Sequence, residues 1–160
     1  MNAVAAMIEP QATDAVVESA LLGTLTVPEN QVFHFDDGIV GFPEAHGFAL
    51  MPARQDGMFW LQSLDFEALT FLMVDPFHFV EGYAVDLGPS ELGAMATREA
   101  SELLVFTILT LPRAAGEPAT ANLQGPVALN IPQRKGRQVV LQDSPYGVRH
   151  PVTLPNAREG

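Results

Sequence analysis

From residue 20 onward, short runs of apolar, aromatic and β-branched residues alternate with turn residues. The runs are LLGTLTV, QVFHF, FALM, MFWLQSL, TFLMVD, HFVEGYAV, ELLVFTILTL, PVALN and RQVVLQ. Runs of this length and composition are typical of β-strands, and the Asp36-Asp37-Gly38 sequence between two of them is typical of a tight turn. About ten such strands with little helical pattern predict an all-β barrel or sandwich.

The longest apolar run, ELLVFTILTL, predicts a strand that is covered on both faces. Leu104, Phe106 and Ile108 would share one face, and the residues between them are also apolar. The PQRKG sequence between PVALN and RQVVLQ predicts a hairpin. In VFHF and in PFHFV the two phenylalanines would face the core opposite a histidine. Only DFEAL at 65–69 and the segment behind Pro89 predict a short helical turn.

The two ends of the chain have weaker patterns than the middle. Residues 1–19 predict a flexible leader, with a short amphipathic helix around Val16 and Val17 as the alternative, and residues 153–160 predict a loose tail. The first residues lack the basic start of a secretory signal, and no segment approaches the ~20 apolar residues that span a bilayer. We therefore expect a cytoplasmic protein that does not bind membranes.

The charge balance is strongly acidic. The chain has 19 acidic and 8 basic residues and a formal net charge of -11. A nucleic-acid-binding domain needs the opposite balance, so direct binding of RNA or DNA is not expected. A basic protein partner would be attracted instead, although the same acidity also serves solubility alone. Before Arg98 the only basic residue is Arg54, so one lobe of the fold should be the more negative.

The sequence offers little for catalysis. It contains no cysteine, and its four histidines show no close metal-ligand spacing. Phosphate-binding loops and the nucleophile-elbow motif are absent from the sequence. The neighbouring carboxylates are explained by turns and strand ends, because general acid–base chemistry needs two of them placed in a cleft. We therefore predict a protein that is not an enzyme and has no cofactor and no metal.

Several blocks in order resemble the FliW family of flagellar assembly factors. They are GIVGFPE at 38–44, FWLQSLD at 59–65, FLMVDPF at 71–77, TLP at 110–112, TANL at 120–123, PVALN at 126–130 and GRQVVL at 136–141. Tyr146 and the Arg149-His150-Pro151 sequence resemble the family's closing segment. Gln124-Gly125 stand where the family more usually has Leu-Ala. The resemblance covers about residues 20–152, nearly all of the predicted folded part.

The resemblance implies a single small antiparallel β-barrel domain over 20–152 with one or two short helical turns. It also implies two protein partners, the RNA-binding translational regulator CsrA and flagellin. In that family, free FliW sequesters CsrA, so flagellin is translated; accumulated flagellin occupies FliW and releases CsrA. Two alternatives remain open. One is a flagellin-specific chaperone without regulatory output, and the other is a flavin-binding split barrel, suggested only by the all-β pattern.

The partner-binding residues are predicted among polar side chains outside the aromatic runs, because Phe59, Trp60 and Phe71 have the pattern of core residues. Acidic residues near turns and strand ends would form a rim that selects a basic partner. Two asparagines in the family-like blocks would either hold turns or offer hydrogen bonds. The predicted set is Asp36, Asp37, Glu44, Asp65, Asp75, Asn122 and Asn130.

Overall fold

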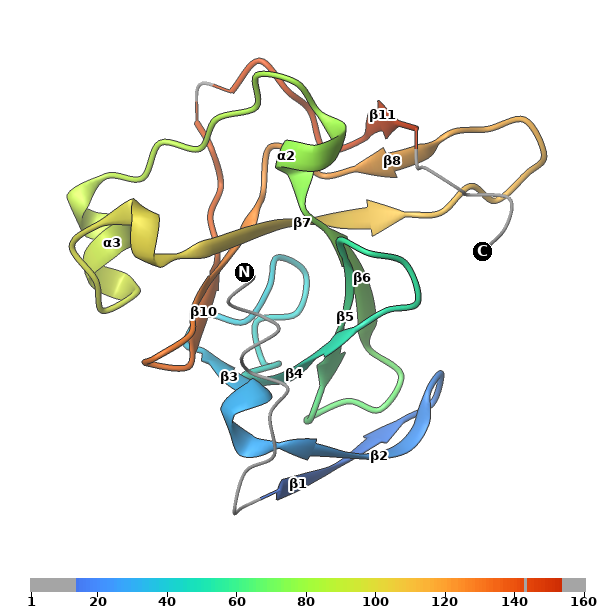
Figure 1. Ribbon diagram of the computed structural model, residues 1–160, viewed down its shortest axis with the longest axis vertical. Helices are drawn as coiled ribbons and strands as arrows, with labels where there is room; N and C mark the ends of the chain where they lie inside the picture. Colours follow the sequence, from blue (N-terminus) through green and yellow to red (C-terminus); the bar gives the residue numbers. More distant parts are fainter. Residues whose placement is uncertain (1–13, 143, 154–160) are drawn as a thin grey trace.

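Seven strands of the computed structural model, which describes residues 14–142 and 144–153, close into a barrel (Figure 1). Around the ring the order is β7-β6-β5-β4-β3-β10-β9, and β9 pairs with β7 to close it. All these pairs are antiparallel except β10 with β3, which is parallel. The predicted all-β barrel is confirmed, with this one exception to its antiparallel pairing. The bounds are β3 Val32–Phe35, β4 Gly47–Pro52, β5 Met58–Ser63, β6 Thr70–Val74, β7 Leu104–Thr110, β9 Val127–Asn130 and β10 Lys135–Gln138.

Aromatic and aliphatic side chains fill the inside of the barrel. Phe33 and Phe35 are fully buried while His34 between them is exposed, as the alternation in VFHF predicts. The Phe35 and Phe48 rings meet edge to face, with their centroids 4.9 Å apart. Burial of each such side chain contributes about 1.5–3 kcal/mol, so this cluster is the main source of stability.

Strand β7 is covered on both faces, as its sequence predicts. Leu104, Phe106 and Ile108 pack into the barrel core. Leu109 faces the other way into a second apolar cluster, which β6 shares with two strands outside the ring. These strands, β8 (Ala119–Ala121) and β11 (His150–Val152), extend the sheet from β7.

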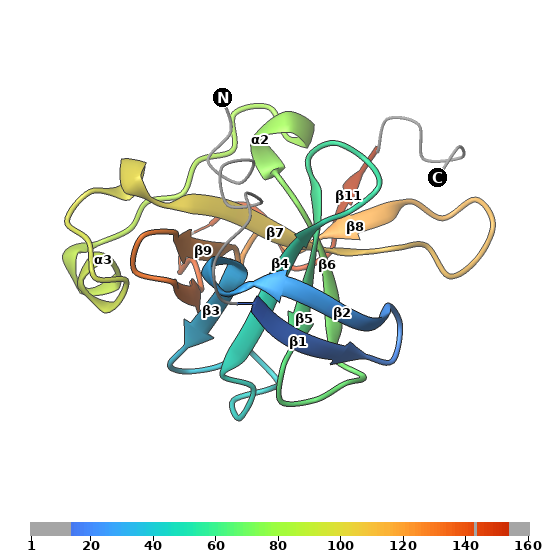
Figure 2. The same cartoon turned by 60° about the horizontal axis from the view of Figure 1, so that its bottom comes forward.

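A hairpin of β1 (Asp14–Ser19) and β2 (Gly23–Pro28) lies across the outside of the barrel (Figure 2). Val17 and Val27 pack onto Ala49 and Met51 of β4, and a 3-10 turn, Glu29–Gln31, leads into β3. The predicted flexible leader is therefore wrong for residues 14–19, and so is the helical alternative there. Extended pairing with β2 explains the alternation of buried and exposed residues in β1, whereas residues 1–13 lie outside the described part.

Two short helices, α2 (Pro76–Phe79) and α3 (Pro89–Ala94), lie between β6 and β7 in the chain, followed by a 3-10 turn at Ala100–Glu102. The helix behind Pro89 is confirmed. The predicted strand HFVEGYAV is wrong, because Pro76 begins helix α2. Phe77 and Phe79 were predicted to face the core together, but Phe77 is 53% exposed. DFEAL forms a turn and not a helix. In the described ranges, no helix is long and apolar enough to cross a membrane.

Candidate binding surfaces

Three of the predicted acidic residues lie on the loop between β3 and β4. Asp36 contacts His34, with Nε2 to Oδ1 at 3.2 Å, and Lys135, with Nζ to Oδ2 at 3.5 Å. Asp37 forms an ion pair with Arg137, and Glu44 is exposed. Asp36 and Asp37 are thus solvent-accessible but fasten this loop to β10, so only part of their charge is free for a partner.

Arg137 joins the same loop to helix α3. Its Nε donates to Glu91 Oε1 at 2.6 Å, and its Nη1 donates to Asp37 Oδ2. The hydrogen bond to Glu91 raises the pKa of Arg137, so the guanidinium stays charged. This bridge fixes the position of the β3–β4 loop relative to α3.

The tip of the loop is a tight backbone turn. Gly38 has φ +65°, and a Cβ on it would lie 2.3 Å from the carbonyl oxygen of Phe42. The Phe42 N–H donates to the Ile39 carbonyl at 2.6 Å, which closes the turn. The turn directs the side chains of Val40 and Phe42 outward, where they are 69% and 42% exposed.

Asp65 ties the β5–β6 loop to the same end of the barrel. Its Oδ2 accepts hydrogen bonds from the N–H groups of His46 at 2.8 Å and Gly47 at 3.0 Å. The hydrogen bond from Gly47 is the main cause that lowers the pKa of Asp65. Asp65 therefore supports the loops at the end of the barrel where Asp36, Asp37 and Glu44 also lie, and the acidic rim stays a prediction.

Exposed apolar side chains lie on the same two loops as these acids, and the sequence did not predict them as binding residues. Leu64 and Phe66 are 41% and 46% exposed on the β5–β6 loop, and Val40 and Phe42 stand on the neighbouring loop. We call residues 36–46 and 64–67 the loop face. Val40 and Phe42 lie in the GIVGFPE block and Leu64 in the FWLQSLD block, but an apolar residue in such a run has the same pattern whether it is buried or exposed. An apolar patch with an acidic rim has the composition of a protein-binding surface.

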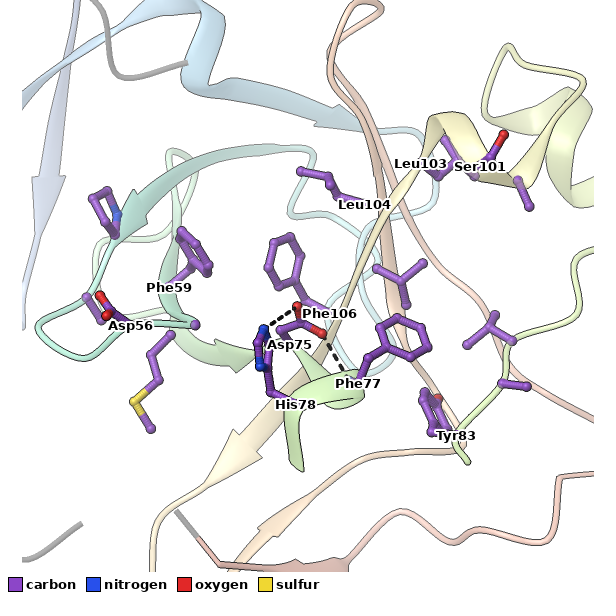
Figure 3. A pocket seen from close by; sticks show the side chains of 18 of the residues that line it. Asp56, Phe59, Asp75, Phe77, His78, Tyr83, Ser101, Leu103, Leu104 and Phe106 are labelled. Carbon is purple, nitrogen blue, oxygen red and sulfur yellow. Dashed lines mark hydrogen bonds and ion pairs between the residues drawn. The ribbon is translucent and has the colours of Figure 1, made fainter. Parts of the chain in front are cut away.

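Asp75 lies at the opposite end of the barrel, apart from the other acids. It caps α2, because its Oδ1 accepts from the Phe77 N–H at 3.0 Å, and its Oδ2 lies 3.6 Å from His78 Nε2. Figure 3 shows it beside an open pocket of about 1050 Å³. Aromatic side chains of Phe59, Phe106 and Phe77 line this space, which we call the β7 edge pocket.

The two predicted asparagines hold local structure. Asn122 Oδ1 accepts from the Gly125 N–H at 2.9 Å and closes the turn that leads to β9. Asn130 is 4% exposed, and its Nδ2 donates to the Met95 carbonyl at 2.7 Å. The structure therefore gives both asparagines a structural contact and does not bring them together with the loop-face acids.

Among residues 14–142 and 144–153, no set of three or more His, Asp or Glu side chains could hold a metal ion. His34 stacks on His46, with the ring centroids 5.9 Å apart, and His78 of α2 lies beside Asp75. Burial raises the pKa of Tyr83 to about 12, and its hydroxyl donates to the Leu123 carbonyl at 2.6 Å, which is a structural contact.

Comparisons with known proteins converge on one family. The family model described as FliW protein matches residues 16–152. The flagellar assembly factor FliW of Treponema denticola is 35% identical over 136 residues, which cover 85% of this chain and 92% of that protein. The FliW of Bacillus subtilis is 35% identical over 138 residues, 86% and 96% of the two chains. A crystal structure of the flagellar assembly factor FliW matches with a TM-score of 0.78 and 28% identity over 86% of this chain and 96% of that one.

Proposed function

This chain belongs to the FliW family of flagellar assembly factors, and we propose from this premise that it binds CsrA and flagellin in turn. Bound to this protein, CsrA would be kept from repressing flagellin translation. Accumulated flagellin would displace CsrA and restore repression. The single observation that carries the proposal is the family match over residues 16–152. The protein would act by binding alone, without catalysis, in the cytoplasm where translation takes place.

The charge of the chain supports a basic partner. An RNA-binding regulator carries a basic surface for phosphates, and the formal net charge of this chain is -11. The loop face offers Glu44 and the exposed parts of Asp36 and Asp37 around the apolar side chains of Phe42 and Phe66. We propose the loop face as the surface on which CsrA is held.

Competition between CsrA and flagellin for the protein would regulate how much CsrA is free. If both partners cannot occupy the protein together, each lowers the apparent affinity of the other by the same factor. The flagellin concentration then sets how much CsrA is free. A flagellin-specific chaperone without regulatory output would bind flagellin in the same way and leave CsrA unaffected.

A competition titration tests the proposal. The purified chain is mixed with CsrA, flagellin is added stepwise, and free CsrA is followed by gel filtration. We expect the chain to form a complex with CsrA, and we expect added flagellin to dissociate that complex. Flagellin binding without CsrA binding would favour the chaperone, a stable three-protein complex would contradict the competition, and no complex with either protein would reject both functions.

Variants at the loop face test whether it is the surface that binds CsrA. Glu44→Lys reverses an exposed charge and should weaken CsrA binding by about tenfold or more. Phe42→Ala removes an exposed ring and should have a similar effect. The matched controls are Glu117→Lys and Leu111→Ala on the β7–β8 hairpin, which are also exposed and should bind as the parent chain does. Equal losses in controls and loop-face variants would exclude this surface.

A further inference from the structure

Strand β7 has two edges, and the backbone groups of successive residues face opposite ones. The Asn122 N–H donates to the Ile108 carbonyl at 2.9 Å, so the backbone of Ile108 faces β8 and β9. Thr107, its neighbour, therefore faces β6, and the register agrees because Thr107 lies opposite Val74. The odd-numbered residues of β7 thus belong to the edge that pairs with β6.

The next backbone group on that edge belongs to Val105, where β6 has already ended. Extending the register by two residues places Val105 opposite Pro76. Pro76 has no backbone N–H and begins α2, so the β6–β7 ladder cannot continue. Among the residues that the structure describes, no strand pairs with Val105 on this edge. An open edge of this kind is a template for another strand.

The β7 edge pocket occupies the gap that β6 leaves between β5 and β7. Met58 and Phe59 at the start of β5 line it, and so do Val105 and Phe106 of β7. Figure 3 shows the side chains of Phe59 and Phe106. The Phe59 and Phe106 rings meet at 5.1 Å and close the gap toward the barrel core. Beside them Phe77 is 53% exposed on α2. The gap therefore combines a backbone edge that no described strand covers with an apolar floor, and helix α2, which also contacts β7, borders it.

The charges at the pocket select the occupant. Asp56 and Asp75 are acidic, and His78 is the only one of the lining residues that can carry a positive charge. Next to the lining residues in the sequence, Glu102, Glu99 and Asp86 are exposed acids and Arg54 is an exposed base, so the acids outnumber the bases. An apolar segment with a basic residue at each end fits this arrangement, because alternate side chains would meet the floor and its ends would meet the carboxylates.

We propose that the β7 edge pocket binds an extended polypeptide segment, apolar in its middle and basic at its ends, which adds to β7 as a strand in the place that β6 vacates. The segment belongs to a partner protein. The pocket lies at the end of the barrel opposite the loop face, so it is a second docking site. Its occupation does not depend on whether CsrA binds the loop face.

Amide hydrogen exchange on the full ¹⁵N-labelled chain tests the proposal directly. The probe is the blocked peptide Ac-Lys-Val-Thr-Val-Thr-Val-Lys-NH2, added to about 1 mM. We expect exchange of the Val105 amide to slow by about tenfold or more, because the peptide carbonyl accepts its hydrogen bond. The Thr107 amide, already in the β6 ladder, should not change. Raising NaCl from about 50 to about 500 mM should weaken binding, because it screens the carboxylates.

Matched controls distinguish strand addition from non-specific binding of the peptide. The same peptide with its five inner residues N-methylated keeps its side chains and charges, but it lacks inner N–H donors and should not bind. Val105→Pro removes the open donor and should lower affinity by about tenfold or more, whereas Val105→Ala keeps the donor and should change affinity by less than about threefold. If Val105→Pro does not fold, the exchange measurement on the parent chain still decides.

Three results would overturn the proposal. The first is no binding at that peptide concentration, or binding that leaves the Val105 amide unchanged. The second is protection of Val105 in the free chain that disappears when residues 154–160 are removed, which would make the chain its own occupant. The third is protection that disappears on dilution, which would make the occupant a second copy. None of these results depends on CsrA or flagellin, so failure here leaves the proposed function standing.

Discussion

Gly136 shows how tightly a single position constrains the barrel. It lies on β10 beside Phe35, and a Cβ built on it would come within 2.2 Å of the buried Phe35 ring. The parallel pairing of β10 with β3 brings the two residues together, since Gly136 is the register partner of Phe35. Only a residue without a side chain allows this approach.

We predict that Gly136→Ala destabilises the protein by at least about 1–3 kcal/mol, because the ring has no free space into which it can move. Chemical denaturation followed by circular dichroism measures this change. Gly147→Ala is the control, since its Cβ would meet no atom within 4 Å, and it should change the stability by less than about 0.5 kcal/mol. Equal stability changes in Gly136→Ala and Gly147→Ala would contradict the close approach of Gly136 to the Phe35 ring.

Asp65 gives the stability a dependence on pH. The Gly47 hydrogen bond holds the pKa of Asp65 in the folded chain below its value in the unfolded chain. The stabilisation is therefore fully present above the unfolded pKa, about 4, and is lost as the pH falls through the folded pKa.

We predict that Asp65→Asn reduces the loss of stability between about pH 5 and pH 3, because the variant has no carboxylate to protonate at this position. Urea denaturation at a series of pH values compares the two chains. Parallel curves would show that the bonds from His46 and Gly47 do not contribute to the acid sensitivity.

Individual contacts of this kind could not be predicted from the sequence. Asp65 and Asp75 are recognisable as acids near turns, but the groups they bond to depend on the fold. Asp65 accepts from residues that lie 18 and 19 positions earlier in the chain. Burial was easier to predict, because the alternation in VFHF distinguishes Phe33 and Phe35 from His34 without any knowledge of distant contacts.

Sequence analysis predicted β2 as a strand but missed β1, and the packing of the β1–β2 hairpin can be tested separately from the barrel. Val17 is 1% exposed and packs with Trp60, the single tryptophan of the chain. We predict that Val17→Asp releases the hairpin, because an unpaired carboxylate cannot stay buried there. The fluorescence of Trp60 should shift to longer wavelength, with a loss of about 1.5–3 kcal/mol in stability.

Val16→Asp is the matched control for that change. Val16 is 66% exposed on the other face of the same strand, so an added charge remains in water. Its tryptophan emission and its denaturation midpoint should equal those of the parent chain. A shift of the same size in both variants would contradict the packing of the hairpin on β4 and β5.

Other elements were predictable to the extent that their residues alternate clearly. Strand β7 has apolar residues on both faces in the sequence and covers two clusters in the structure. PFHFV alternates in the same way, yet Pro76 and the Asp75 cap turn it into α2. In that segment, local capping outweighs a period-two pattern. The same proline leaves the edge of β7 open, so the misassigned element is also the one that shapes the pocket.

At the scale of the whole molecule, closure of the barrel depends on contacts that no local pattern reveals. The ring is completed by β9 against β7 and by the parallel pair of β10 with β3. Sequence patterns predicted the strands of the ring and the β9–β10 hairpin, but not β1, β8 or β11. The closed barrel was expected from the family resemblance. Register between strands about 100 positions apart depends on which side chains fit inside the closed ring.

The acidity of the chain is also a property of the whole molecule, and it opposes folding. A formal net charge of -11 on one small barrel causes repulsion, which salt screens. We predict that raising NaCl from about 20 to about 300 mM stabilises the protein and raises Tm by about 2–4 °C. The same salt should weaken the complex with a basic partner, because it screens the attraction between the two proteins. Differential scanning fluorimetry and a binding titration in the same buffers measure the two effects.

A charge-neutralised variant isolates repulsion from other effects of salt. Gln is placed at four exposed acidic positions, and the chain then carries four fewer negative charges at the same volume. The substituted positions are Glu44, Glu67, Glu81 and Glu117. Because less repulsion remains to be screened, its Tm should start higher at low salt and rise less with added NaCl. If Tm rises by the same amount in both chains, salt acts through the burial of apolar surface and not by screening repulsion. The acidity of the chain would then not destabilise its fold.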